Sequence, residues 1–251
     1  MKKKIVAIML MASLAIASVA CGSTKEIEPA TNESSVEESS VEESVEETTE
    51  EADEADSEEE AKEVSEEEVD DSEFTSGVIN GNVYENMFFD VTYTIQDDMR
   101  FATEDELALL SGAMSDLVDD EATKSQLDNG QTVIVAYALN ADNTKTFNVT
   151  MSSLNVFGSL LSEKTLVDMS IEQAMPTLEQ MYQNVEVSTE EMEIMGETHY
   201  VANMSMEMNG VQLYQRQMYI IKGSYVSAYT CATTDLAELD KLYEGFAKYN
   251  D

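Results

Sequence analysis

Cysteine, histidine, proline and tryptophan are scarce in this sequence of 251 residues, which has two cysteines, one histidine, two prolines and no tryptophan. Cys21 and Cys231 allow at most one disulfide, and none once either thiol is modified. A Ser-His-Asp or Cys-His catalytic site would have to be built around His199, and no nucleophile motif stands near it. Zinc-ligand spacings and glycine-rich phosphate loops are also absent from the sequence. We therefore expect no catalytic residues and a fold that depends on its hydrophobic core.

Basic residues are few as well, with 13 Lys and Arg against 52 Asp and Glu and a net charge of −39. Like charge repels nucleic acids and anionic lipid headgroups, so we expect neither as a partner. The apolar run Ile5–Ala17 is shorter than the roughly 20 residues that a membrane-spanning helix needs.

The first 20 residues have the three parts of a secretory signal peptide. Three lysines at residues 2–4 precede the apolar run, and the small residues 18–20 lead to Cys21. We expect residues 1–20 to be cleaved. Removal of the three lysines takes the net charge of the mature chain from −39 to −42.

Ser18-Val19-Ala20-Cys21-Gly22 resembles the bacterial lipobox, although Ser18 stands where that pattern prefers leucine. The resemblance implies a lipoprotein of Gram-positive type whose Cys21 carries palmitate-like acyl chains. Such chains contribute about 0.8 kcal/mol per buried methylene, so two or three hold a soluble protein at a membrane. We expect an extracellular protein with a lipid membrane anchor at Cys21, on the outer face of the cell membrane. An ordinary secretory peptide with a chance cysteine is the alternative.

Residues 21–73 are expected to be the lipidated N-terminus and an acidic disordered tether. The stretch contains Lys25 and Lys62 among many Asp and Glu, has no aromatic residue, and repeats Ser-Val-Glu-Glu three times. Such a segment buries too little apolar surface to offset its ordering entropy. A neutral chain of this length spans roughly 40 Å, and a fully extended one on the order of 170 Å. We favour a spacer through the cell wall over a site that captures divalent cations.

Aromatic residues and hydrophobic periodicity begin at residue 74, and residues 74–251 have the length of a single domain. A strand is expected over Met87–Ile95, and Thr103 with Glu106 forms a capping box for a helix that continues through Leu107, Leu110, Met114 and Leu117. Thr132–Leu139 is apolar throughout, as in a central strand covered on both faces. Thr146–Leu154 alternates, as in a strand half exposed to solvent.

The second half of this domain is expected to begin with a helix within Ser170–Tyr182, in which Pro176 causes a kink or marks the first turn. Glycine-containing turns then separate four strands, and a helix opened by Asp235 ends the chain. The expected strands are Val185–Met195, Tyr200–Met208, Val211–Lys222 and Tyr225–Ala232. Strands joined by two-residue turns are antiparallel, so the fold class is α+β: an antiparallel β-sheet with helices packed on its faces, an α/β/α sandwich.

Two segments resemble the Mog1/PsbP-like domains found in small Gram-positive lipoproteins. The first is Gly81-Asn82-Val83-Tyr84-Glu85-Asn86-Met87-Phe88-Phe89, and the second is the hairpin Leu213–Tyr225 before the last helix. The resemblance covers residues 74–251 and implies that fold, together with a non-enzymatic accessory or binding role. It implies no catalytic residues and no cofactor.

Several residues invite a chemical interpretation and have a simpler structural one. His199 is expected to be a surface histidine on the polar side of its strand, and Cys231 a buried thiol rather than an intermolecular one. Met204, Met206 and Met208 share one face, with Met192 and Met195 on a neighbouring strand; copper(I) binding is conceivable, but core packing is favoured. Asp116, Asp119, Asp120 and Glu121 could hold Ca²⁺, but they lack EF-hand spacing.

The function expected from these observations is a membrane-anchored extracytoplasmic lipoprotein that acts as a non-catalytic binding or accessory module. Its partners would be the membrane, through the acyl chains, and an envelope or surface protein. Two other classes stay open: a surface lipoprotein that binds Ca or Cu, and a cell-envelope hydrolase that uses two carboxylates about 5–10 Å apart.

Overall fold

The computed structural model describes residues 73–111, 120–154 and 161–249. The expected signal peptide, Cys21 and the acidic tether lie outside these residues, as do Met114, Asp116, Leu117 and Asp119.

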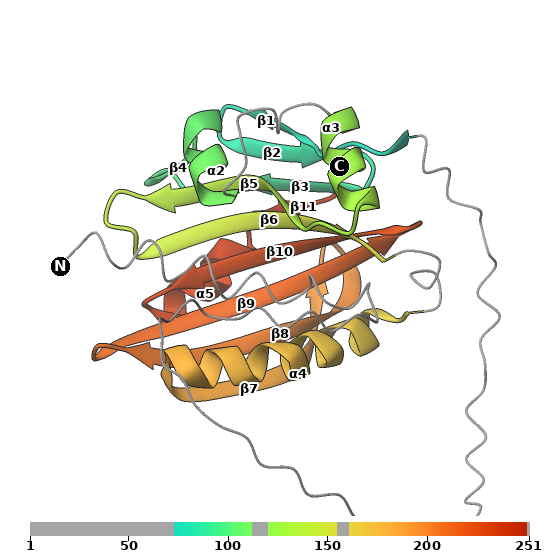
Figure 1. The fold of residues 1–251 in the computed structure, drawn as a ribbon. Helices are drawn as coiled ribbons and strands as arrows, with labels where there is room; N and C mark the ends of the chain where they lie inside the picture. The colour runs from blue at the N-terminus through green and yellow to red at the C-terminus, as the bar shows by residue number, and fades with distance from the viewer. Residues whose placement is uncertain (1–72, 112–119, 155–160, 250–251) are drawn as a thin grey trace, which may run out of the picture. The chain divides into compact units, whose positions relative to one another are not determined.

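A seven-stranded antiparallel sheet forms the centre of the fold, in the order β4-β5-β6-β10-β9-β8-β7 (Figure 1). Its strands are β4 (Met99–Phe101), β5 (Val133–Asn140), β6 (Lys145–Ser153), β7 (Gln183–Ile194), β8 (Glu197–Met208), β9 (Val211–Lys222) and β10 (Tyr225–Thr233). The four strands predicted in the second half of the domain are confirmed as β7 to β10.

The turns between these strands follow from local chemistry. Met195 and Gly196 have φ of 55° and 76°, and Asn209 and Gly210 have φ of 53° and 77°. Two consecutive residues with positive φ form the turn whose twist matches that of antiparallel strands. The glycine-containing turns predicted between β7 and β8 and between β8 and β9 are therefore confirmed.

A second, four-stranded sheet has the order β1-β2-β3-β11. Its strands are β1 (Val78–Asn80), β2 (Val83–Asn86), β3 (Val91–Thr94) and β11 (Phe246–Ala247). The strand predicted over Met87–Ile95 is wrong at its start, because Asn86 Oδ1 accepts a hydrogen bond from Phe89 N at 2.9 Å and holds a turn there. Phe88 and Phe89 are buried from this turn rather than from a strand.

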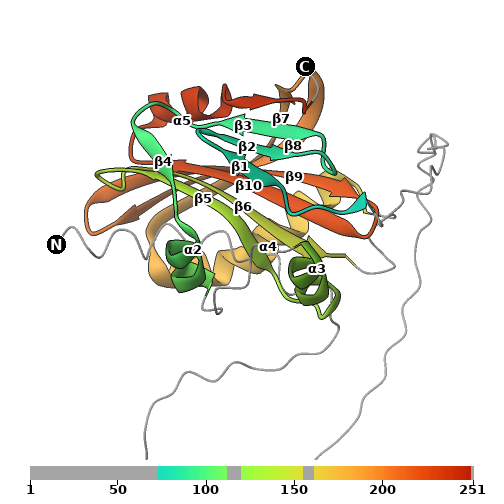
Figure 2. The same cartoon turned by 90° about the horizontal axis from the view of Figure 1, so that it is seen from above.

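Helices cover both faces of the large sheet. Figure 2 shows α2 (Glu104–Ser111), α3 (Asp120–Asp128) and α4 (Glu163–Met181) on one face, and α5 (Leu236–Tyr243) with the small sheet on the other. The predicted class, an antiparallel sheet with helices on its faces, is confirmed. The small sheet was not predicted as a separate layer.

The predicted exposure of β6 is wrong. Asn148, Thr150 and Ser152, expected to face solvent, are 2%, 2% and 5% exposed. β6 lies between β5 and β10 within the sheet, so its burial is set by neighbours that alternation in its own sequence cannot reveal. β5 is covered on both faces, as predicted, although it lies next to the edge strand β4.

Two helices differ from their predicted limits. α4 begins at Glu163, where the Ser162 side chain accepts from Thr165 N, and continues through Pro176. Pro176 is therefore inside the helix and not in its first turn. α5 opens as predicted, with the Asp235 side chain accepting from Ala237 N, but it ends at Tyr243.

Candidate functional site

The Gly81–Phe89 motif anchors the chain that leads into β1. The buried Tyr84 hydroxyl donates to Ser76 O at 2.8 Å and accepts from Asn86 Nδ2 at 3.0 Å. Burial raises the pKa of Tyr84 well above its ordinary value, so the hydroxyl stays a donor. Asp120 Oδ1 accepts from Ser76 N and Oγ at 2.7 and 2.6 Å, which ties this segment to α3. The motif is structural, and it fixes one wall of a groove.

This groove, of about 720 Å³, lies between β1, α2 and the outer edge of β5, and we name it the β1–α2 groove. Its apolar lining is Val78 and Ile79 from β1, Leu107 and Ala108 from α2, and Ile134 and Val135 from β5. Val78 and Ile79 are 54% and 37% exposed, so large apolar side chains meet solvent here. A volume of this size lies in the range of pockets that bind ligands.

Two strands that line the groove each have a side on which no described strand pairs. β4 pairs with β5 only as far as Phe101 and Ala138, and Ala102 N then donates to Tyr137 O before the chain turns into α2. Beyond that point no described strand pairs with the outer side of β5. Among the strands of residues 73–111, 120–154 and 161–249, β1 pairs with β2 alone, along one side. Unpaired strand edges carry backbone donors and acceptors that an added strand can use.

The rim of the groove is acidic. Glu104 and Asp105 lie in the first turn of α2 and line the groove. The guanidinium of Arg100, on the strand before α2, is held by Glu106 through two bonds of 2.7 Å. In the described part of the chain no basic side chain pairs with Glu104 or Asp105, so the rim attracts positive charge.

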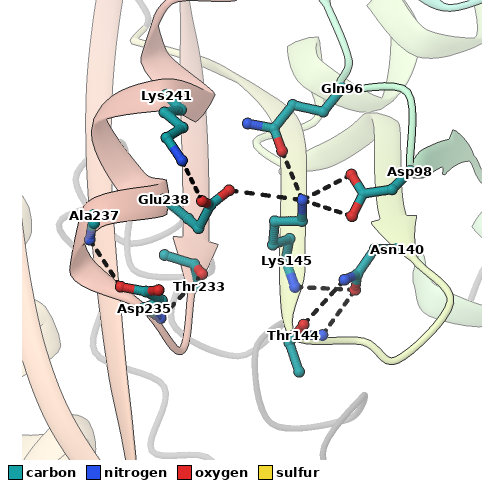
Figure 3. A network of polar contacts seen from close by, with 10 residues as sticks. All are labelled: Gln96, Asp98, Asn140, Thr144, Lys145, Thr233, Asp235, Ala237, Glu238 and Lys241. Atoms are coloured by element: carbon teal, nitrogen blue, oxygen red, sulfur yellow. Dashed lines mark hydrogen bonds and ion pairs between the residues drawn. The ribbon is translucent and has the colours of Figure 1, made fainter.

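Lys145 is a basic residue elsewhere in the fold that is held by several acceptors. Figure 3 shows Lys145, whose side chain is 12% exposed, with its Nζ bonded to Gln96 Oε1 and Asp98 Oδ1, each at 2.7 Å. Glu238 on α5 lies 3.8 Å from the same nitrogen and pairs with Lys241 at 2.6 Å. This network joins the chain between β3 and β4 to β6 and α5. Its role is structural, because the lysine is surrounded by acceptors.

The prediction that His199 lies at the surface is wrong. The residue is 6% exposed, and its Nδ1 lies 2.9 Å from Glu163 Oε1. Pairing between β8 and β9 stops at Val201 and Met218, and beyond that point Glu163, the first residue of α4, also accepts from Tyr200 N at 3.4 Å. Sequence alternation could not show this contact, because α4 lies far away along the chain.

The methionines pack as core residues, as predicted. Met204 and Met206 are 6% and 2% exposed in the cluster under α4. Met192 and Met195 pack against the other cluster, on the α5 side of the sheet. The thioethers considered for copper are therefore divided between two faces.

Cys231 is fully buried, as predicted, and its Sγ lies 3.7 Å from Tyr93 Oη. Burial raises the pKa of its thiol to about 12. Of the acidic cluster considered for Ca²⁺, Asp120 is used as the acceptor for Ser76. Among the described residues no group of three His, Cys, Asp or Glu is placed to hold a metal ion. Nor does any helix in those ranges have the length and apolarity to span a membrane.

Neither a protein family nor a curated protein matches this sequence, whereas several solved structures do. A cyanobacterial PsbP from Synechocystis matches at 8% identity over 69% of this chain and 95% of that one, with a TM-score of 0.43. LpqN of Mycobacterium tuberculosis, involved in cell envelope biogenesis, matches at 11% identity over 62% and 82% of the two chains, with a TM-score of 0.36. A putative regulator of unknown function from Pseudomonas aeruginosa matches at 17% identity over 40% and 67%, with a TM-score of 0.31.

Proposed function

We propose that the protein is a lipid-anchored, extracytoplasmic binding module, not an enzyme, and that it holds an extended segment of an envelope or surface protein in the β1–α2 groove. The observation that carries this proposal is the groove itself, where exposed apolar side chains meet two strand edges that no other described strand covers. An extended segment can add to a strand edge through main-chain hydrogen bonds, while side-chain pockets supply specificity.

The expected partner segment is apolar with adjacent basic residues. Apolar side chains of the segment would cover Val78 and Ile79, which now meet water. Lysine or arginine beside them would meet Glu104 and Asp105 at the rim, where complementary charge mainly speeds association and selects the partner.

The signal peptide and lipobox give this module its location. Acyl chains on Cys21 would hold the chain at the membrane, and the acidic stretch of residues 22–73 would give it reach. Replacing Cys21 by Ala should release the protein from cells into the medium. If the Cys21→Ala protein stays with the cell membrane, the anchor is not at this residue.

Binding in the groove is tested with a photo-crosslinking amino acid placed at Val78 in intact cells. An adduct with one partner is expected from Val78. The same probe at Leu109, which is 84% exposed on α2 but does not line the groove, should yield none. Equal adducts from both positions would mean that the groove is not the binding surface.

The role of the acidic rim is tested in the same experiment. Glu104→Gln with Asp105→Asn should lower the yield of the Val78 adduct, more so at low salt, because exposed charges are screened at higher ionic strength. Glu172→Gln with Glu179→Gln removes the same charge from exposed positions on α4 and should leave the yield unchanged.

A further inference from the structure

A second concavity, of about 440 Å³, lies on the α5 side of the large sheet, where β7, β8 and β9 meet α5. We name it the β7–α5 pocket. Its floor contains a single row of side chains across three strands, because Ser188 pairs with Asn203 and Asn203 pairs with Arg216. The pocket is separate from the β1–α2 groove and shares no lining residue with it.

Arg216 is the unusual member of this row, because it is a charged side chain that is only 8% exposed. Its Nε donates to Asn203 Oδ1 at 2.6 Å, and its Nη1 donates to Asp240 Oδ1 at 2.9 Å. The guanidinium also lies over the ring of Tyr243, 5.0 Å from its centre. These contacts fix the guanidinium plane of Arg216, which lines the pocket.

Two donors that line the pocket have no acceptor among the described residues. Asn203 must turn its oxygen toward Arg216 Nε, so its Nδ2 points the other way, and that buried nitrogen has no partner among the described residues. No described residue accepts from Arg216 Nη2 either. An unpaired buried donor is uncommon in a folded protein, and Asn203 Nδ2 beside the Arg216 guanidinium favours a ligand that brings acceptor oxygens, as a carboxylate does.

Carboxylates form the opposite side of the pocket. Glu186 and Glu190 lie on β7, two residues to either side of Ser188 and on the same face. Their neighbours are hydroxyl groups at long distance, Ser205 Oγ at 3.5 Å and Ser188 Oγ at 3.4 Å. In the described ranges no basic residue forms an ion pair with either glutamate, so this side favours a cation.

The third wall is apolar. Leu236 and Leu239 of α5 and Tyr214 of β9 line the pocket, and Leu236 is 53% exposed at the first position of the helix. An apolar group in the pocket would cover this leucine. The pocket therefore offers donors for an anion, acceptors for a cation, and an apolar surface beside them.

We propose that the β7–α5 pocket binds a free α-amino acid with an apolar side chain. The carboxylate would accept from Arg216 and Asn203, and the ammonium group would donate to Glu186 or Glu190. A lone anion would be repelled by the glutamates, and a lone cation would leave the donors of Arg216 and Asn203 unpaired.

The distances suit a ligand of this size. Arg216 reaches over β8, so the gap to the carboxylates of β7 is one strand spacing plus an offset of two residues along the strand, about 8 Å in all. An α-amino acid bridges such a gap, because two charge-assisted hydrogen bonds of about 2.8 Å extend its two adjacent charged groups.

The test is a calorimetric titration of L-leucine, L-isoleucine and L-phenylalanine into the mature chain. At least one should bind with a saturable heat. Its amide, which lacks the carboxylate, and its N-acetyl derivative, which lacks the charged amine, should each bind about tenfold more weakly or worse. Absence of heat with all three amino acids, or equal binding of both derivatives, would overturn the proposal.

Variants separate the pocket from other surfaces. Glu186→Gln with Glu190→Gln should weaken binding about tenfold or more, since both positions are exposed and the fold does not depend on them. Glu193→Gln, an exposed glutamate on the opposite face of the same strand, should leave the affinity unchanged. Equal weakening by the Glu193 variant would show that general charge, not the pocket, governs binding. Arg216→Lys keeps the charge but removes the planar donor pair, so it should weaken binding of the amino acid more than binding of its amide.

Discussion

The ring of Tyr93 on β3 lies flat against the ring of Phe147 on β6, with centroids 3.6 Å apart and planes inclined by 13°. This stack joins the small sheet to the large one. Phe246 of β11 completes the contact, with its ring centre 4.7 Å from that of Tyr93. Both stacked residues are fully buried, so they lie within the core between the two sheets.

Phe147→Ala should lower the free energy of unfolding by about 3–5 kcal/mol, because it removes a buried ring and leaves a cavity between the sheets. Tyr93→Phe keeps the stack and removes only the hydroxyl beside Cys231, so it should cost about 1 kcal/mol. Urea unfolding of the two variants measures the difference. A smaller loss for Phe147→Ala than for Tyr93→Phe would mean that the stack does not hold the sheets together.

Gly77 should tolerate no side chain. Its φ is 88°, and a Cβ there would lie 2.6 Å from the hydroxyl oxygen of Tyr84. Gly77→Ala should therefore destabilise the protein by about 1–3 kcal/mol and displace Tyr84 from Ser76. Gly81→Ala is the matched control, because Gly81 also has a positive φ, of 65°, but open space around it. Gly77→Ala should lower the thermal unfolding temperature more than Gly81→Ala, because only the first substitution creates a clash. Equal effects of the two substitutions would mean that backbone strain alone causes the loss of stability.

Local signals made the second half of the fold predictable. Asn209-Gly210 takes positive φ at both residues, and its turn sets the register of β8 and β9 through pairs such as Met208 with Val211. Asp235 caps α5 through one backbone nitrogen two residues away. Interactions over such short separations depend on neighbouring residues, so the local sequence predicts them.

Long-range pairing explains what was missed. β11 consists of Phe246 and Ala247, which pair with Tyr93 and Thr92 of β3 far away along the chain. A two-residue strand has no periodicity of its own. The buried polar face of β6 has the same cause, because its cover comes from other elements.

The residues of the two candidate sites also come from distant parts of the chain, so local patterns in the sequence did not predict either site. Val78 and Ile134 line one groove from distant parts of the chain, and no motif connects them. The position of Arg216 was a weak indication of the β7–α5 pocket, since this charged residue alternates with Tyr214 and Met218 on the apolar side of its strand. A charge at such a position is expected to be paired when buried, but the sequence does not identify Asn203 or Asp240 as its partners.

Glu106 contributes to stability in a pH-dependent way. Its hydrogen bonds with Arg100 and Thr103 N lower its pKa from 4.5 to about 2. A carboxyl with a lowered pKa stabilises the fold above its ordinary pKa, and the contribution is lost as the pH falls from about 4.5 toward 2.

Glu106→Gln should therefore cost about 0.5–1 kcal/mol near neutral pH, a modest value because the pair is open to solvent. The difference from the parent protein should shrink as the pH falls from about 4.5 and be small near pH 2. Urea unfolding at both pH values measures it, with Glu104→Gln as the control, since that side chain makes no bond to Thr103 or Arg100. A difference that persists at low pH would have to come from packing instead of charge.

The thiol of Cys231 should be unreactive in the folded protein. With a pKa of about 12, set mainly by burial, only roughly one thiol in ten thousand is ionised at pH 8, and the thiolate is the species that reacts. In a Cys21→Ala chain, where Cys231 is the only thiol, iodoacetamide should label the native protein very slowly and the urea-unfolded protein at the rate of a free cysteine. Met87→Cys adds a thiol at a position that is 57% exposed, and its rapid labelling in the same chain serves as the control. Because the raised pKa means that unfolding releases a proton, stability should also fall as the pH rises from about 9 toward 12. Fast labelling of native Cys231 at pH 8 would contradict this account, since the thiol would then have to reach solvent without unfolding.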